Sequence, residues 1–227
     1  MKLTKQTVKK MLLPVMQKHL DSSLKEYGFT RNKSSIEYKL STSEAKQKII
    51  VENRIPSYSD SKYLFAIEPY FNVTMPAITN ELLKIARGQK ELLPPIEPTI
   101  GMNIAFIAEE GQNRIYKEWR IQNQEELDKA GEELRNYIVS LVLPPLGKLK
   151  TVEELASSYE ELTKKRLWSK DKEVLTFTAA YLVLGDYQKA HEVLKNGFTG
   201  KRSLRLYRFV FDYVENFPQT VDNNNNF

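Results

Sequence analysis

The sequence has 227 residues, of which 41% are hydrophobic and 28% are charged, and its formal net charge is +5. This composition supports a packed core and excludes an intrinsically disordered chain, and the length fits one large domain or one domain with an appendage. Cysteine is absent, and the two histidines are His19 and His191. These facts exclude disulfides, thiolate zinc sites, iron–sulfur clusters and cysteine nucleophiles, so we expect no metal and no other cofactor.

The basic start of the chain resembles the opening of a signal peptide. Its apolar run, Met11 to Met16, is too short for one, and no small-residue cleavage site follows it. No apolar stretch approaches the roughly 20 residues that span a bilayer. We therefore expect a cytoplasmic protein that does not contact a membrane.

The first predicted element is a helix over residues 4–27, which Gly28 would end. Pro14 either kinks this helix or begins its main part, because proline lacks the amide proton of an interior position. The helical spacing predicts one buried stripe, made of Leu13, Met16, Leu20, Leu24 and Tyr27.

About five strands follow, because apolar residues alternate with polar ones between turn-forming segments. A short helix over residues 77–87 separates the third strand from the fourth. Pro69 lies inside the third run, which favours an edge strand or a bulge there. The turn at residues 109–113 predicts a hairpin between the last two strands. The predicted strands cover residues 35–40, 47–55, 63–73, 102–108 and 114–121.

From Asn123 onward the hydrophobic period changes from two to 3.6, which predicts helices only. In the first of them, residues 124–142, the inward positions are Leu127, Leu134, Ile138 and Leu141. Pro144 and Pro145 should break the chain after it. Further helices are predicted over residues 151–162, 172–184, 187–195 and 201–217.

This segregated order predicts an α+β fold: an N-terminal helix, an antiparallel sheet of about five strands with helices on one face, and a C-terminal helical extension. We expect an α+β domain over residues 1–165, the extension over 166–218 and a flexible, asparagine-rich tail over 219–227.

Residues Ala179 to Ala190, AAYLVLGDYQKA, resemble the turn between the two helices of a tetratricopeptide repeat. In that repeat the Leu-Gly-Asp-Tyr turn lets two helices pack closely, and the alanine lies where they touch. The sequence has one such copy, whereas solenoids need about three or more repeats. We therefore expect a single helical hairpin that caps the domain, in preference to a peptide-binding groove.

A second pattern begins with a helix that ends at Gly28-Phe29 and continues through the basic turn Thr30-Arg31-Asn32-Lys33 into the strand Ile36-Glu37-Tyr38. Ile121 to Leu127 then runs from a strand into a capped helix. This pattern is similar to a family of uncharacterised bacterial α+β proteins and covers about residues 7–165. Some members are suspected to act as antidotes near toxin systems, so the resemblance implies a fold class and an antidote role.

Acidic residues gather in the predicted helix after Asn123. Glu125, Asp128 and Glu132 share one helix face, so a metal site or an acid–base pair is geometrically feasible. A di-metal bundle would need a Glu-x-x-His motif, which neither histidine supplies. We therefore interpret this face as solvated and, with Glu126 and Glu133, as a candidate interaction surface.

Basic residues gather in the last predicted helix, where Arg205, Arg208 and either Lys201 or Arg202 fall on one side. Leu204, Tyr207, Phe211 and Val214 fall on the other. Such a basic face could follow phosphates, although no aromatic residue interleaves with it. We favour an ordinary solvated face, or a surface that pairs with the acidic helices, over nucleic-acid binding.

These observations predict a binding or interaction protein without catalysis, specifically an immunity-like antidote with a protein partner of unknown identity. Two alternatives stay open: a nucleic-acid-associated protein that uses the basic helix, and a carboxylate-dependent enzyme of unknown reaction. The candidate interaction surface consists of Glu125, Glu126, Glu132, Glu133, Lys201, Arg202, Arg205 and Arg208.

Overall fold

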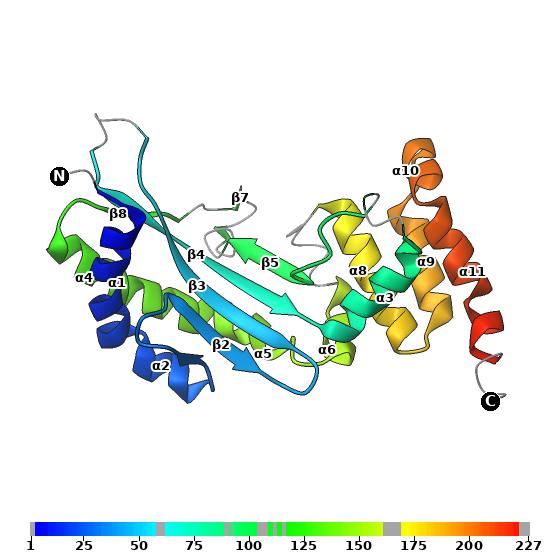
Figure 1. The fold of residues 1–227 in the computed structure, drawn as a ribbon, viewed down its shortest axis with the longest axis horizontal. Coiled ribbons are helices and arrows are strands. Elements are labelled where there is room, and N and C mark those ends of the chain that lie inside the picture. Colours follow the sequence, from blue (N-terminus) through cyan, green and yellow to red (C-terminus); the bar gives the residue numbers. More distant parts are fainter. Residues whose placement is uncertain are drawn as a thin grey trace. The chain divides into compact units, whose positions relative to one another are not determined.

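The computed structural model describes residues 3–57, 62–88, 91, 93–103, 109–110, 113–114, 117–160 and 169–222. It has the α+β fold expected from the sequence, with an N-terminal helix, an antiparallel sheet and C-terminal helices (Figure 1). The chain forms two compact units. Unit 1 contains residues 1–42, 46–73 and 101–147, and unit 2 contains residues 43–45, 74–100 and 148–227.

Unit 1 begins with two helices where the sequence predicts one. Helix α1 covers Lys5–His19, with Pro14 inside it, and α2 covers Asp21–Glu26. The buried stripe consists mainly of Val8, Leu12, Val15, Met16, Leu20 and Leu24. The prediction was wrong for Leu13, which is only half-buried because the buried face of α1 is centred on Leu12, Val15 and Met16. It was also wrong for Tyr27, which follows the end of α2 after the break at Leu20 and is 50% exposed.

The main sheet has six strands among the described residues, in the order β1-β2-β3-β4-β5, with β8 also paired to β4. Figure 1 shows β2, β3 and β4 side by side. The strands are β1 (Thr30–Arg31), β2 (Glu37–Ser41), β3 (Lys46–Arg54), β4 (Phe65–Thr74), β5 (Ile100–Asn103) and β8 (Trp119–Ile121). A separate antiparallel pair, β6 (Glu109–Glu110) and β7 (Asn113–Arg114), forms a hairpin here, but its strands include Glu109, Glu110 and Asn113, so the prediction of a turn was wrong for these three residues. The remainder of that hairpin, residues 104–108, 111–112 and 115–116, lies outside the described residues.

Among the described residues of unit 1, helices cover one face of the sheet and the other face is open. Gln47, Ile49 and Val51 of β3 are buried, whereas the residues between them are exposed or half-buried. Tyr38 pairs with Ile49 in the β2–β3 register, so both lie on the covered face. Helices α1 and α4 (Gln124–Tyr137) pack on each other and on strands of the sheet, which covers this face.

Pro69 lies in a central strand, so the prediction of an edge strand was wrong. Strand β4 pairs with β3 on one side and with β8 and β5 on the other. The register with β8 covers Phe65 to Ile67 and ends before Pro69. Proline lacks an amide donor, and β4 accommodates it beyond the segment that β8 pairs.

Arg31, the basic residue of the turn after Gly28-Phe29, has a side chain that is only 3% exposed. It donates from Nε and Nη2 to the two carboxylate oxygens of Asp21, over 2.8 and 2.7 Å, and the Tyr38 hydroxyl donates to Oδ1 over 2.6 Å. Burial raises the pKa of Asp21, but the hydrogen bonds from Arg31 and Tyr38 outweigh it and hold the pKa below its ordinary value. This cluster ties α2 to the sheet.

The helix after Asn123 continues further than predicted. Helix α4 leads into a π-helical turn, η3 (Ile138–Val142), and then into α5 (Leu143–Gly147), which contains Pro144 and Pro145. The expected break at these prolines was wrong, because the prolines stand at the start of a new helical turn where amide protons are not needed. Leu141, expected to face inward, is 37% exposed, since the wider π turn changes the phase of the buried face.

Unit 2 contains α3 (Pro76–Ala86), α6 (Val152–Ser157), α8 (Lys170–Val183), α9 (Tyr187–Gly197), α10 (Lys201–Leu206) and α11 (Arg208–Asp222). Helices α8 and α9 form the predicted hairpin, with Asp186 capping α9 by accepting from the Lys189 amide over 3.0 Å. Ala190 is fully buried, as expected of the alanine at the helix contact. The hairpin is confirmed, and its likeness to a tetratricopeptide repeat stays a prediction.

The compact units and the predicted domains describe different properties of the chain. Helix α3 lies between strands in the sequence but contacts α8 and α11, so residues 74–100 belong to unit 2. The expected domain boundaries at residues 165 and 218 concern independent folding and stay predictions. No helix of the described segments is both long and apolar enough to cross a membrane.

Candidate functional site

The four glutamates of the predicted acidic surface make different contacts in unit 1. Glu126 accepts the Gln122 amide over 2.7 Å and so caps the start of α4. Glu133 forms an ion pair with Lys117 over 3.1 Å. Glu125 and Glu132 are exposed and form no ion pair with any described residue. Only two of the four carboxylates are therefore free to meet a partner.

Asp128, which the sequence places on the face of Glu125 and Glu132, is already bound within unit 1. Its Oδ2 lies 2.7 Å from Lys18 Nζ, and its Oδ1 lies 2.8 Å from His19 Nε2. Hydrogen bonds from Lys18 and His19 lower the pKa of this carboxyl. The side chain of His19 is thus a helix–helix contact between α1 and α4. Within the described part of the chain, no group of three or more histidine, aspartate or glutamate residues could hold a metal ion.

Five charged and aromatic residues form a network on the open face of the sheet in unit 1, and we call it the arginine–glutamate network. Arg54 on β3 donates from Nε to Glu68 on β4 over 2.6 Å, and its Nη2 contacts Glu118. Arg120 on β8 donates from Nε to the second oxygen of Glu118 over 2.7 Å and lies over the ring of Tyr63. The hydrogen bond to Glu68 and the charge of Glu118 raise the pKa of Arg54. The positive charges of Arg54 and Arg120 are thus balanced by the negative charges of Glu68 and Glu118.

Beside this network, β8 and α4 enclose a hollow of about 210 Å³, which we call the β8–α4 hollow. Three basic and three acidic residues contribute to its lining, together with Trp119, whose side chain is buried. Lys117 Nζ lies 5.3 Å from the centre of the Trp119 ring. The lining residues are Lys117, Glu118, Trp119, Arg120, Glu126, Lys129, Ala130 and Glu133.

The larger opening lies in unit 2, between α9 and the helices α10 and α11. Its volume is about 800 Å³, and we call it the basic groove. The residues that line it are His191, Lys195, Leu204, Arg205, Arg208, Phe211 and Glu215. Two of the predicted basic residues, Arg205 and Arg208, therefore line a groove together with His191 and Lys195 of α9, which the sequence analysis did not assign to an interaction surface.

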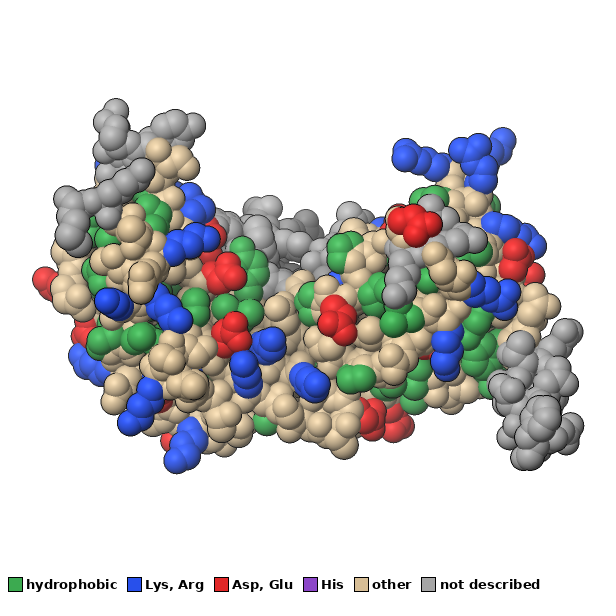
Figure 2. All heavy atoms as spheres, viewed as in Figure 1, with side chains coloured by type: hydrophobic (Ala, Val, Ile, Leu, Met, Phe, Trp, Pro, Cys, Tyr) green, Lys and Arg blue, Asp and Glu red, His purple; other side chains and the backbone are tan. Residues whose placement is uncertain are grey.

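Most of the cations around the basic groove are free to meet an anion. Within the described segments, Lys195, Lys201, Arg202 and Arg205 are exposed and form no ion pair. Arg208 differs, because its Nε lies 2.8 Å from Asp212 Oδ1 and its Nη2 lies 3.9 Å from Glu215. Figure 2 shows lysine and arginine side chains gathered at the α10 end of unit 2.

The basic groove also offers apolar surface. Leu204 and Leu206 are 41% and 39% exposed, whereas Tyr207, Phe211 and Val214 are buried. The sequence placed Leu204 on the buried side of one continuous helix, and this was wrong. The helix breaks at Tyr207, and α10, a short separate helix, has no buried residue. The Tyr207 hydroxyl donates to Asp171 over 2.8 Å and its ring stacks on Phe198, so this break is fixed by packing.

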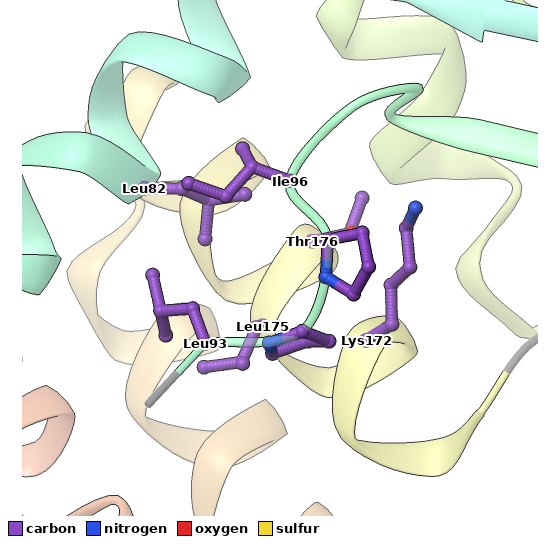
Figure 3. Close-up of a pocket in the computed structure, with 8 residues that line it drawn as sticks. Leu82, Leu93, Ile96, Lys172, Leu175 and Thr176 are labelled. Carbon is purple, nitrogen blue, oxygen red and sulfur yellow. The ribbon is translucent and has the colours of Figure 1, made fainter. Parts of the chain in front are cut away.

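A third, much smaller hollow of about 10 Å³ lies in unit 2 between α3, α8 and residues 93–96. Figure 3 shows Leu82, Leu93 and Leu175 together, with the amine of Lys172 apart from them. Lys172 Nζ donates to the Pro98 carbonyl over 2.6 Å, and burial lowers the pKa of this amine. A volume of this size holds about one water molecule, which makes it a packing feature and not a binding site.

The residues that sequence reasoning missed were detectable in part. His191 and Lys195 are four residues apart on a predicted helix, so they share a face. Glu118 and Arg120 flank Trp119 on a predicted strand, where alternate residues share a face. Neither pattern indicates which helix packs opposite, and the grooves depend on that packing.

Comparisons with protein family models, curated proteins and solved structures found no match to this chain. The two resemblances noted from the sequence stay predictions.

Proposed function

We propose that this chain is a binding protein whose basic groove holds an acidic segment of a protein partner, with an apolar side chain of that segment packed on Leu204. The observation that carries the proposal is the placement of unpaired cations and exposed leucine in one groove. Lys195 and Arg205 supply positive charge without a bound anion, and Leu204 supplies apolar surface beside them.

Charge complementarity supports an acidic partner. Charges at the rim of an interface act over roughly 8–10 Å at physiological salt, and they raise the association rate and select partners of opposite sign. The groove contains one carboxylate, Glu215, and it already lies near His191 and Arg208, at 3.9 Å from each. The unbalanced charge in the groove is therefore positive.

The apolar surface favours a protein over a nucleic acid. Single-stranded nucleic acids bind by stacking bases on exposed aromatic rings. The aromatic residue that lines the groove, Phe211, is 7% exposed, whereas Leu204 is 41% exposed. An aliphatic side chain next to lysine and arginine suits a glutamate- or aspartate-rich segment that carries leucine or isoleucine.

The experiment uses the full chain and three fluorescein-labelled peptides of equal length, followed by fluorescence anisotropy. The first peptide combines glutamate and leucine, the second replaces leucine by serine, and the third replaces glutamate by lysine. We expect binding in the order glutamate–leucine, glutamate–serine, lysine–leucine, with the first weakened by added salt. Equal binding of all three would contradict the proposal. A labelled single-stranded DNA that binds more tightly than the first peptide would establish the nucleic-acid alternative.

An antidote role is one form of the proposed binding function, because an antidote acts by binding its toxin. The resemblance to the bacterial family is what supports it. The proposal predicts that the toxin would present acidic surface to unit 2. A toxin that binds through a basic surface would overturn this assignment of the groove.

A further inference from the structure

We infer that the basic groove of unit 2 binds a helical segment with two oppositely charged ends. The carboxylates of the segment lie at Lys195 and Arg205, and a basic side chain two turns further along the same helix face lies at Glu215. Glu215 thereby selects this kind of partner among acidic segments. This selectivity rests on the function proposed for the groove, because it requires that an acidic segment binds there.

The basic groove runs between two helices that pack antiparallel. The ring of Tyr187, at the start of α9, lies 4.9 Å from the ring of Phe217 on α11. One turn further along α9, His191 Nε2 lies 3.9 Å from Glu215, which precedes Phe217 on α11. The contacts thus move backward along α11 as they move forward along α9. Lys195, another turn along α9, therefore lies toward the start of α11, where α10 joins it.

The charges in the groove are distributed unevenly along its length. At the α10 end, Lys195 and Arg205 form no ion pair with any described residue. Glu215 lies toward the other end, and seven residues separate it from Arg208 at the start of α11, about 10 Å along the helix axis. Charges are screened over about 8 Å at physiological salt, so groups bound at the two ends act largely independently. The groove therefore has a cationic end and an end with a carboxylate.

The carboxylate of Glu215 is accessible to a partner. Its contacts with His191 and Arg208 both measure 3.9 Å, whereas an N–H···O hydrogen bond measures about 2.7–3.2 Å. Arg208 instead directs Nε at Asp212 over 2.8 Å. The Glu215 side chain is 47% exposed, and none of the described residues donates a hydrogen bond to its carboxylate. A lysine or arginine of the partner supplies the missing donor.

A helix is the partner element that matches these positions. Grooves between packed helices bind amphipathic helices through side chains at spacings of three, four and seven residues. Seven residues span about 10 Å, which equals the separation between the start of α11 and Glu215. A leucine beside the partner's glutamates reaches Leu204, next to Arg205 in the sequence. A uniformly acidic helix places a carboxylate against Glu215, and these like charges repel.

The test compares three fluorescein-labelled helical peptides of equal length that share the same glutamates and leucine. The first has lysine two turns after the glutamates on the same face, the second has glutamine there, and the third has the lysine on the opposite face. We expect the first to bind the unsubstituted chain about two- to fivefold more tightly than the others, as measured by fluorescence anisotropy, which is the range for an exposed ion pair.

E215Q should abolish the preference for the first peptide. E192Q is the matched control, because it removes an exposed carboxylate of α9 that does not line the groove, and it should keep the preference. R205Q should weaken all three peptides by the same factor, since Arg205 meets the glutamates that they share.

Equal binding of the three peptides by the unsubstituted chain overturns the role of Glu215, and so does a preference that E215Q retains. If none of the three peptides binds, the function proposed for the groove is itself contradicted, and the selectivity fails with it.

Discussion

Arg208 Nε lies 2.8 Å from Asp212 Oδ1, one helical turn further along α11, whereas Arg205 has no carboxylate partner among the described residues. The two arginines line the same groove but differ in the charge that they can offer. Arg205 presents a full positive charge, and the charge of Arg208 is largely balanced within its own helix. Because of this difference, the variants R205Q and R208Q can be compared to measure what an unpaired charge in the groove contributes to binding.

R205Q should weaken binding of the glutamate–leucine peptide about two- to fivefold, because the lost rim charge contributes up to about 1 kcal/mol. R208Q should weaken it less, since Asp212 already neutralises that guanidinium. Fluorescence anisotropy at low and physiological salt measures both. K170Q removes an exposed lysine at the start of α8 that does not line the groove, and it controls for the change in net charge. A larger loss in R208Q than in R205Q would contradict the assignment.

The acidic surface predicted from the sequence divides into two pairs. E125Q with E132Q removes two exposed, unpaired carboxylates, and we expect neither the fold nor the binding of the acidic peptide to change. E126A with E133Q removes the side-chain acceptor of the Gln122 amide at the start of α4 and the ion pair with Lys117, and should lower the free energy of unfolding by about 1 kcal/mol. Urea unfolding measures both variants. Equal unfolding free energies for the two double variants would show that the contacts of Glu126 and Glu133 do not stabilise the fold.

D21N should lower the free energy of unfolding by about 1–3 kcal/mol, because Arg31 is left buried without its carboxylate. The pKa of Asp21 in the folded state lies below its ordinary value of 3.8, so the unfolded chain binds the proton more readily. The stabilisation is therefore present above pH 3.8 and is lost as the pH falls through the lower, folded pKa. Urea unfolding across this range should show D21N and the unsubstituted chain converging at acidic pH. If the two unfolding free energies differ by the same amount at every pH, the ionised Asp21 carboxylate is not the source of the stabilisation.

Gly197 tests the close contact within the α8–α9 hairpin. A Cβ at this position would lie 2.2 Å from Val174 Cγ2, so G197A should force the helices apart and cost about 1–3 kcal/mol in unfolding free energy. G147A is the control, because a Cβ there meets nothing within 4 Å. We expect G147A to leave stability nearly unchanged, as measured by denaturant unfolding. Two variants of equal stability would mean that the contact relaxes without cost.

The sequence was sufficient for the class of fold, because the change from a period of two to a period of 3.6 at Asn123 is a local property of the chain. It was also sufficient for the α8–α9 hairpin, whose turn and buried Ala190 lie within one continuous segment. It failed where packing changes the phase of a helix. The break at Tyr207 depends on Phe198 and Asp171, and neither is adjacent in sequence.

The candidate site could be predicted only in part for the same reason. Arg205 was identified from its place in a basic run, but its neighbours Lys195 and His191 come from another helix. Glu133 was read as a free carboxylate, although Lys117 reaches it from the segment before β8. Charge patterns identify ionisable residues along one element, and tertiary contacts decide which of them remain unpaired.

The most direct test of the basic groove is a reversal of its charge. The double variant K195E with R205E replaces two unpaired cations by anions and leaves Leu204 in place. We predict that this variant loses the glutamate–leucine peptide and gains the lysine–leucine peptide, with circular dichroism confirming the same helical content. If the variant keeps the preference of the unsubstituted chain for the glutamate–leucine peptide, the acidic partner does not bind in this groove.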